Sequence, residues 1–313
     1  MTDKMLEDDR FARDEVQDLY ASFARRMVQE PGMSIDAMRD LFDQWHQATA
    51  EPGAVTYREV FDAPVPATWC IPPAANDRRA IVYTHGGGFV VGSRHSHRKL
   101  AGHLAARSAT PVLVIDYRRA PEHPHPAQVE DTVSVAKWLM HSEGRLHWEI
   151  ALVGDSAGGN IAVSSALKLT QEGLAPAAVV AMSPWFDMEN SGASLEENAE
   201  HDAMVNRPAL EIMTNLVLSG ASPQAPAANP LYADLSSLPP VLVTASEHET
   251  LRDDATRFVA QAEAAGRDAT LLLEPNAQHV FQMAAGKSRA ADRSLEQIGA
   301  WLQTRFAASS PDR

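Results

Sequence analysis

The chain has 313 residues, of which 45% are hydrophobic, and carries a formal net charge of −14. This length and apolar content suffice for a substantial buried core, while the negative charge argues against nucleic acid or an anionic membrane surface as a partner. Cys70 is the single cysteine, so an intrachain disulfide is excluded.

The beginning of the chain is helical in pattern. Apolar residues recur at helical spacing within residues 1–50, for example at Leu19 and Phe23. Two apolar runs near residues 56–62 and 66–71 come next, and they could supply an antiparallel edge to a sheet. The helices either pack as core on the edge of that sheet or form a lid over a site.

A regular alternation of strands and helices fills most of the remaining chain. Apolar strand candidates lie at residues 80–85, 111–116, 149–154, 177–183, 240–245 and 269–274. The stretches between them are mostly helical in pattern, and this βαβ alternation predicts an α/β fold with a mainly parallel sheet and helices on both faces. Residues 188–235 interrupt the alternation and contain a helix-like segment at residues 208–217.

The first of these strands leads into a glycine-rich loop, His85-Gly86-Gly87-Gly88-Phe89. Consecutive glycines let amide N–H groups converge without interference from side chains. Acyl transfer needs such donors where negative charge develops on a carbonyl oxygen. A plain loop-closing turn is the simpler interpretation, and a phosphate loop would require a lysine and a hydroxyl residue directly afterwards. Phe89-Val90-Val91 supplies neither, so the sequence favours an oxyanion loop.

The run Gly154-Asp155-Ser156-Ala157-Gly158 matches the G-x-S-x-G nucleophile elbow. An apolar strand runs into it and a helix of small residues leaves it, which is the context that the motif requires. An ordinary turn between strand and helix is the alternative. The glycine loop 68 residues before Ser156 favours the elbow, and we expect Asp155 to stabilise nearby loops.

A nucleophilic serine requires a histidine as base and an acid that orients the histidine. In α/β hydrolases the acid follows the serine along the chain, and the histidine follows the acid. Of 12 histidines, only His279 lies beyond both Ser156 and the last apolar strand. The acid should follow the strand at residues 240–245, and position alone favours Glu249 for its place on the loop and its reach. The other carboxylates that position leaves open are Glu247, Asp253, Asp254 and the more remote Asp187.

From about residue 78 to 283 the chain resembles the hormone-sensitive-lipase-like, or bacterial family IV, esterases of the α/β-hydrolase superfamily. The segments that carry the resemblance are His85–Phe89, Tyr117–Glu122 (Tyr-Arg-Arg-Ala-Pro-Glu), Gly154–Asn160, Ser183–Trp185 and His279–Gln282. The resemblance implies Ser156 as nucleophile and His279 as base. It further implies that the amides of Gly87, Gly88 and Ala157 form the oxyanion hole.

One departure from the family concerns the acid. The family has Asp-Pro-Leu-x-Asp where this chain has Glu249-Thr250-Leu251-Arg252-Asp253. Glu249 therefore falls on the catalytic acid, in agreement with its position, and glutamate is an accepted triad acid. The resemblance also implies a helical cap, made of residues 1–50 and an insertion at about residues 188–235, on a catalytic domain of residues 51–313.

The sequence thus predicts a serine carboxylesterase that hydrolyses short- to medium-chain esters and uses no cofactor. Lactone opening or amide deacetylation on the same residues stays open, because specificity lies in the cap. A receptor that binds a small molecule without catalysis is the third possibility. The polar, acidic start and the lack of a membrane-length apolar run predict a cytoplasmic protein, and family members often dimerise through a sheet edge.

A metal site is the remaining alternative, suggested by a group of histidines between residues 95 and 125. Its members are His95, His97, His103, His123 and His125. Their spacing matches no zinc signature. Prolines at positions 121, 124 and 126 also prevent a regular helix from presenting the last two, so we expect no metal.

Overall fold

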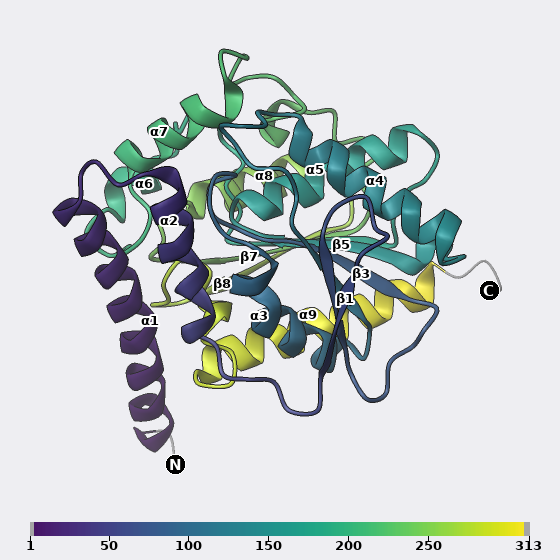
Figure 1. The fold of residues 1–313 in the computed structure, drawn as a ribbon, viewed down its shortest axis with the longest axis horizontal. Helices are drawn as coiled ribbons and strands as arrows, with labels where there is room; N and C mark the ends of the chain where they lie inside the picture. Colours follow the sequence, from purple (N-terminus) through teal and green to yellow (C-terminus); the bar gives the residue numbers. More distant parts are fainter. Residues whose placement is uncertain (1–2, 310–313) are drawn as a thin grey trace.

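The computed structural model describes residues 3–309, and side chains from residue 16 onward. Within this range eight strands form one sheet in the order β1-β2-β4-β3-β5-β6-β7-β8 (Figure 1). The strands are β1 (Thr56–Val60), β2 (Ala67–Ile71), β3 (Ala80–Thr84), β4 (Val112–Ile115), β5 (Ile150–Asp155), β6 (Ala178–Met182), β7 (Val241–Ser246) and β8 (Ala269–Glu274). β2 pairs antiparallel with both β1 and β4, and all other pairs are parallel. The predicted α/β sheet with an antiparallel edge is confirmed.

Helices cover both faces of the sheet (Figure 1). On one face lie α3 (Arg94–Ser108) and α9 (Arg289–Ala308), and on the other lie α4 (Ala127–Ser142), α5 (Ala157–Gln171) and α8 (Arg252–Ala264). Every residue of β3, β5 and β6 is buried. Near-continuous apolar strands of this kind are what a parallel sheet covered on both faces requires.

The remaining helices gather at one end of the molecule, on the left in Figure 1. They are α1 (Asp3–Gln29), α2 (Ile35–Phe42), α6 (Ser194–Glu197) and α7 (Arg207–Leu218), with the 3-10 turns η1 (Asp43–Gln47), η2 (His147–Glu149), η3 (Pro230–Tyr232) and η4 (Phe281–Ala284) elsewhere along the chain. The helices expected before residue 50 and over residues 208–217 are therefore confirmed as helices.

These outer helices lie over loops that leave the carboxyl ends of the parallel strands. From α2, the Arg39 guanidinium donates to the carbonyl of Val90 at 3.0 Å and pairs with Glu122 at 2.7 Å. From α1, the Tyr20 hydroxyl donates to the carbonyl of His279 at 3.0 Å. In parallel α/β sheets this edge is where sites form.

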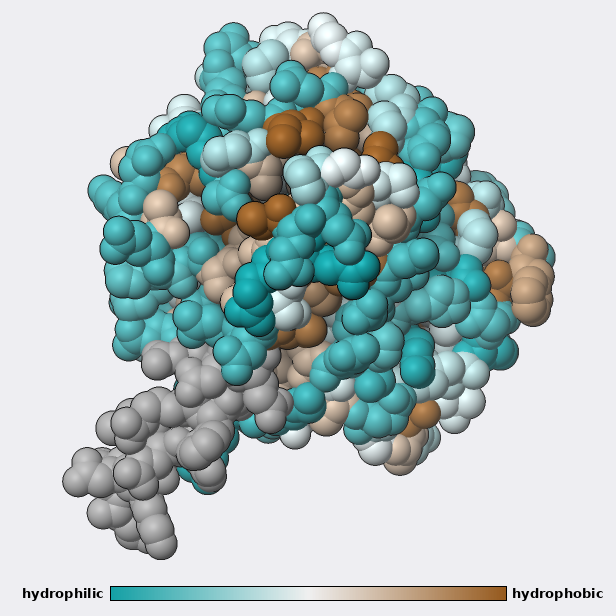
Figure 2. Space-filling model, turned by 60° about the vertical axis from the view of Figure 1, so that its left-hand side comes forward, coloured by the Kyte–Doolittle hydropathy of each residue, from teal (hydrophilic) through white to brown (hydrophobic). Residues whose placement is uncertain are grey.

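The face that carries these helices is turned forward in Figure 2. Its surface is mostly hydrophilic, with small apolar groups showing between polar residues in its middle and upper part. Among the helices of residues 3–309, none combines the length and apolarity needed to cross a lipid bilayer.

Candidate active site

Ser156 lies in a sharp turn between β5 and α5, at 8% exposure. Its backbone has φ 54° and ψ −122°, a strained conformation for a residue with a side chain. The turn closes only because its glycines have no Cβ. A Cβ at Gly154 would lie 2.2 Å from the carbonyl oxygen of Gly158, and one at Gly158 would lie 2.0 Å from that of Thr84. Strand and helix therefore approach to backbone contact behind the serine.

The glycine loop follows β3 beside this turn. Gly87 and Gly88 have φ of +113° and +60°, where side chains are disfavoured. A Cβ at Gly87 would also lie 2.3 Å from the carbonyl oxygen of Val91. No acceptor among the described residues takes a hydrogen bond from the amides of Gly87 or Gly88. Both are thus available to a developing negative charge.

Asp155 ties the two turns together from behind. Its Oδ1 accepts from the Tyr83 hydroxyl at 2.7 Å and from the amide of Gly86 at 3.1 Å. Its Oδ2 lies 3.3 Å from Nε2 of His97. Burial raises the pKa of Asp155, but His97 and the Tyr83 hydroxyl outweigh it, so the net pKa is lowered. The expectation that Asp155 stabilises nearby loops is confirmed.

His279 and Glu249 meet across the loops that follow β8 and β7. Nδ1 of His279 lies 3.2 Å from Oε2 of Glu249, and the two residues are 2% and 0% exposed. The backbone beside His279 is held by the Val280 amide, which donates to the Ser183 hydroxyl oxygen at 3.0 Å. The structure thus brings together the two residues that sequence position selected as base and acid.

The pKa values of this pair follow from burial and mutual attraction. Burial alone lowers the pKa of His279. The hydrogen bond and charge of Glu249 outweigh it, helped by the carboxylates of Asp202 and Asp155, so the pKa lies above 6.5. Burial raises the pKa of Glu249 against the opposing effect of His279. An imidazole oriented and made more basic in this way suits proton transfer.

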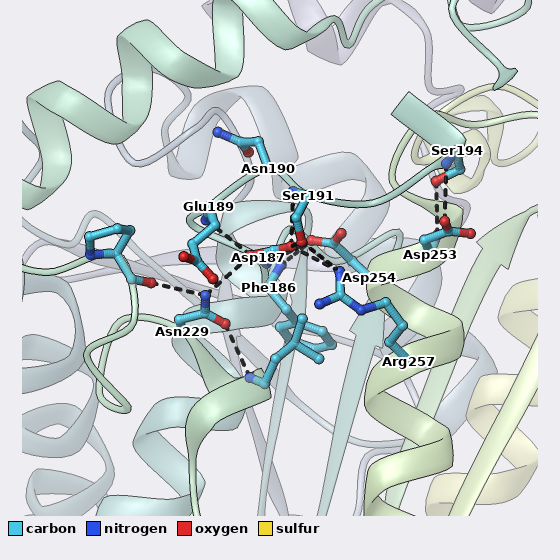
Figure 3. Close-up of polar contacts among 12 residues, drawn as sticks. Phe186, Asp187, Glu189, Asn190, Ser191, Ser194, Asn229, Asp253, Asp254 and Arg257 are labelled. Carbon is cyan, nitrogen blue, oxygen red and sulfur yellow. Dashed lines mark hydrogen bonds and ion pairs between the residues drawn. The ribbon is translucent and has the colours of Figure 1, made fainter. Parts of the chain in front are cut away.

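Three of the other acids considered from the sequence, Asp187, Asp253 and Asp254, form hydrogen bonds or ion pairs with residues other than His279 (Figure 3). Asp187 accepts from the Ser191 hydroxyl at 2.6 Å and from Arg257 at 2.9 Å. Asp253 accepts from the amide of Ser194 at 3.0 Å. These two carboxylates therefore hold loops together at the foot of the inserted segment.

Two further acids complete that set. Asp254 accepts from the amides of Phe186 and Asp187 at 2.7 and 2.8 Å (Figure 3). Burial raises its pKa from 3.8 to about 7. The side chain of Glu247 is exposed. The structure places only Glu249, of the five acids, in hydrogen-bonding contact with His279.

The histidines that suggested a metal do not form one group. His97 contacts Asp155, and His103 Nε2 lies 3.0 Å from the carbonyl of Ala50. Across the part of the chain that the structure describes, no three or more histidine, cysteine or acidic residues are grouped so as to hold a metal ion.

Sequence reasoning missed the side chains that brace this site from outside the sheet. Tyr20 contacts the carbonyl of His279, and Asp202 contacts the residue after Glu249. The helical spacing that placed Phe23 inside could have indicated Tyr20, three residues earlier. Asp202 stands in a polar stretch without a pattern, so no sequence signal marked it.

Comparison with known proteins gives consistent results. A family model described as the alpha/beta hydrolase fold matches residues 81–283. An acetyl-hydrolase of Streptomyces hygroscopicus is 34% identical over 271 residues, which is 86% of this chain and 90% of that protein. Esterase LipU of Mycobacterium tuberculosis is 36% identical over 237 residues, 74% of this chain and 80% of that protein.

Solved structures agree. An esterase from the bacterial hormone-sensitive lipase family superposes with a TM-score of 0.87 at 38% identity, covering 93% of this chain and 98% of that one. A hormone-sensitive lipase from a metagenome library gives a TM-score of 0.83 at 34% identity, covering 88% and 92%.

Proposed function

This chain belongs to the hormone-sensitive-lipase-like esterases of the alpha/beta hydrolase family, and from this membership we propose that it works through a Ser156–His279–Glu249 triad. It is a carboxylic ester hydrolase. What the proposal adds is the residues, the covalent mechanism and the class of ester.

The contact between His279 and Glu249 carries the proposal. The two residues come from loops 30 positions apart, and their 3.2 Å approach orients Nδ1 toward the carboxylate. Nε2 is then left to act on the serine. Together with the strained turn at Ser156, this supplies the nucleophile, the base and the group that orients the base.

In the first step, Oγ of Ser156 bonds to the ester carbonyl carbon while its proton passes to Nε2 of His279. The carbonyl oxygen becomes an oxyanion, which the amides of Gly87, Gly88 and Ala157 stabilise by hydrogen bonds. When the tetrahedral intermediate collapses, the bond to the alcohol oxygen breaks and that oxygen takes the proton from His279. The acyl group remains on Ser156.

In the second step, a water molecule gives a proton to Nε2 of His279 as its oxygen attacks the acyl carbon. The same amides hold the second oxyanion. Collapse breaks the bond to Oγ, which recovers the proton, and releases the carboxylic acid. No atom outside the chain, the ester and water takes part.

The helices at the carboxyl edge of the sheet point to esters of short to medium acyl chain. We assign residues 1–50 and about 188–235 to a cap on the catalytic domain of residues 51–313. The insertion packs directly on the glycine loop, since a Cβ at Gly88 would lie only 2.0 Å from Sδ of Met213 in α7. A helix this close to the oxyanion loop limits the room for a long acyl chain.

Hydrolysis of p-nitrophenyl esters from acetate to palmitate tests the proposal. Ser156→Ala should abolish turnover, and Glu249→Gln should lower kcat on the order of 10³-fold or more, because the imidazole loses its orienting charge. Matched controls are Ser165→Ala, whose hydroxyl in α5 has no hydrogen-bond partner among the described residues, and Glu247→Gln, whose side chain is exposed. Both should keep wild-type rates.

The pH profile provides a second readout of the same variants. His279 must be neutral to accept a proton, and its pKa is raised mainly by Glu249. Wild-type kcat/KM should therefore fall on the acid side, and the residual activity of Glu249→Gln should fall at a lower pH. Full activity of Ser156→Ala would refute the mechanism. A wild type that neither turns over any ester nor reacts with a serine-directed phosphonate would favour a receptor instead.

A further inference from the structure

One stretch of the inserted segment, residues 198–205, makes hydrogen bonds to both loops that carry the proposed acid and base. We call it the bridging segment. Nδ2 of Asn198 donates to the carbonyls of Glu247 and Glu249, each at 2.9 Å. One buried side chain of the insertion thus binds the backbone on either side of position 248.

Asp202 makes the second connection. Its Oδ2 accepts from the amide and the hydroxyl of Thr250, each at 3.0 Å. Its Oδ1 accepts from the amides of Met204 and Val205, each at 2.9 Å. At 9% exposure, the carboxylate is almost fully surrounded by its four donors. Thr250 directly follows Glu249, so these bonds fix the backbone at the acid itself.

Gln278 makes the third connection, beside the base. Its Oε1 accepts from the amide of Ala203, and its Nε2 donates to the carbonyl of His201, both at 2.9 Å. The bridging segment therefore holds the residue after Glu249 and the residue before His279 at the same time. Residues 201–203 are therefore hydrogen-bonded to both loops.

The carboxylate of Glu249 depends on this support. Its Oε2 contacts His279 and its Oε1 has no hydrogen-bond partner among the described residues, while the Ser183 hydroxyl lies near enough to the carboxylate to lower its pKa against the larger effect of burial. A carboxylate with so few side-chain partners depends on its own backbone for its position. Asn198 binds the carbonyls of Glu247 and Glu249, and Asp202 binds the amide of Thr250, so this backbone is bonded before and after the Glu249 Cα. A displacement of about 1 Å at such a group can cost on the order of 10²-fold in rate.

We propose that Asp202 is a positioning residue of the catalytic site, which holds Glu249 against His279 through its two bonds to Thr250. The insertion is then part of the catalytic framework as well as a cover. This inference rests on the proposed function, because it gives a role to a residue that acts through the proposed acid.

Asp202 also affects His279 by its charge. The charged or polar groups that face His279 are Glu249 from the loop after β7, Asp202 from the insertion, Asp155 from the elbow, and the Tyr20 hydroxyl from α1. Burial lowers the pKa of His279, and the three carboxylates raise it, Glu249 most. Removing the charge at position 202 alone should therefore lower the pKa of His279.

The test is Asp202→Asn. The retained oxygen can still accept from Met204 and Val205, while the new NH₂ group meets the N–H of Thr250 as a second donor. With p-nitrophenyl butyrate, kcat should fall about 10-fold while KM stays within about twofold. The acid limb of kcat/KM should move to lower pH. Asp234→Asn, an exposed position in the same insertion, makes the same charge change and should alter none of these values.

Thr250→Val serves if Asp202→Asn fails to fold, as judged by circular dichroism and thermal melting. It removes only the hydroxyl bond and keeps the charge, so kcat should fall by about two- to fivefold with the acid limb in place. A wild-type kcat in Asp202→Asn would overturn this inference and leave the proposed function standing. If Asp202→Asn does not fold, a wild-type kcat in Thr250→Val would do the same. A wild type without esterase activity or phosphonate labelling would instead remove the proposed function, and the positioning role with it.

Discussion

The part of this site that carries the proposed nucleophile, here called the nucleophile side, and the part that carries the proposed acid and base, here called the acid–base side, are held in different ways. Ser156 and the glycine loop are fixed by backbone crowding inside the sheet, where a single Cβ at Gly158 would overlap the carbonyl of Thr84. Glu249 and His279 are held by hydrogen bonds with the bridging segment, about 50 residues before the acid loop: Asn198 and Asp202 bind the acid loop with their side chains, and Gln278 binds the backbone of residues 201–203. One side is built from close contact between backbones, and the other from hydrogen bonds between loops.

Because the two sides are held differently, we expect them to respond differently to mutation. Backbones in direct contact leave no room for an added side chain, so a substitution there should affect the whole fold. A lost hydrogen bond between loops leaves room for the loops to move, so a substitution there should affect catalysis or its pH dependence before it affects the fold. Three variants outside the triad, in order of decreasing effect, probe the crowded turn, a buried acid next to the acid loop, and the contact between the insertion and the glycine loop.

Gly158→Ala should have the largest effect. Its Cβ would lie 2.0 Å from the carbonyl oxygen of Thr84 and 2.7 Å from that of His85. We expect a loss of more than about 4 kcal/mol in the free energy of unfolding, measured by urea denaturation, or no soluble protein. Gly53→Ala is the control, because nothing lies within 4 Å of its Cβ. A Gly158→Ala protein that unfolds like the wild type would refute the rigidity assigned to the nucleophile side.

Asp254→Asn should have a smaller, pH-dependent effect at the foot of the acid–base side. Burial raises the pKa of Asp254 from 3.8 to about 7, so the folded protein binds a proton there that the unfolded chain releases. This group therefore costs stability as pH rises from about 4 to 7. The asparagine oxygen can still accept from Phe186 and Asp187.

The variant should thus gain stability relative to the wild type as pH rises through that window. Urea denaturation at several pH values between 4 and 8 measures the difference. A difference that is constant over this range would show that Asp254 does not titrate as its burial indicates. Asp234→Asn, whose side chain is exposed, provides the baseline.

Met213→Ala should have the smallest effect, and it tests whether the insertion also acts on the nucleophile side. The thioether lies on Gly88 in the oxyanion loop. Next to the oxyanion loop the thioether is also apolar surface that a bound short ester can contact, and losing about 1 kcal/mol of that contact should raise KM roughly fivefold. The thermal midpoint should change little. Ile212→Ala, one position earlier and 62% exposed, is the matched control, and identical KM values for the two variants would contradict the contact.

The same contrast explains what the sequence could predict. The strands, the glycine loop and the turn at Ser156 each have a signature within a few consecutive residues, so apolar runs and glycines marked them. Glu249 could be chosen because chain order narrowed the acid to one loop, and the structure then places it beside His279. Its role as the acid stays a prediction until Glu249→Gln is measured.

The roles of Asn198 and Asp202 could not be predicted, because these roles depend on contacts with residues about 50 positions away. Both are polar residues in a polar stretch, a composition that ordinary surface loops share. Only the folded chain brings them against the backbone of residues 247–250. Tyr20 is an intermediate case, since helical spacing indicates that it faces inward but does not reveal the carbonyl of His279 as its partner.

The bridging segment also bears on how such enzymes can be recombined. Exchanging residues 188–235 with the corresponding insertion of a relative would be the natural way to transplant substrate preference. Here that exchange would also replace the partners of Thr250 and Gln278. A hybrid enzyme should have a higher kcat when residues 247–250 and 278 are exchanged together with the insertion, because each hydrogen-bond donor and its acceptor then come from the same parent protein.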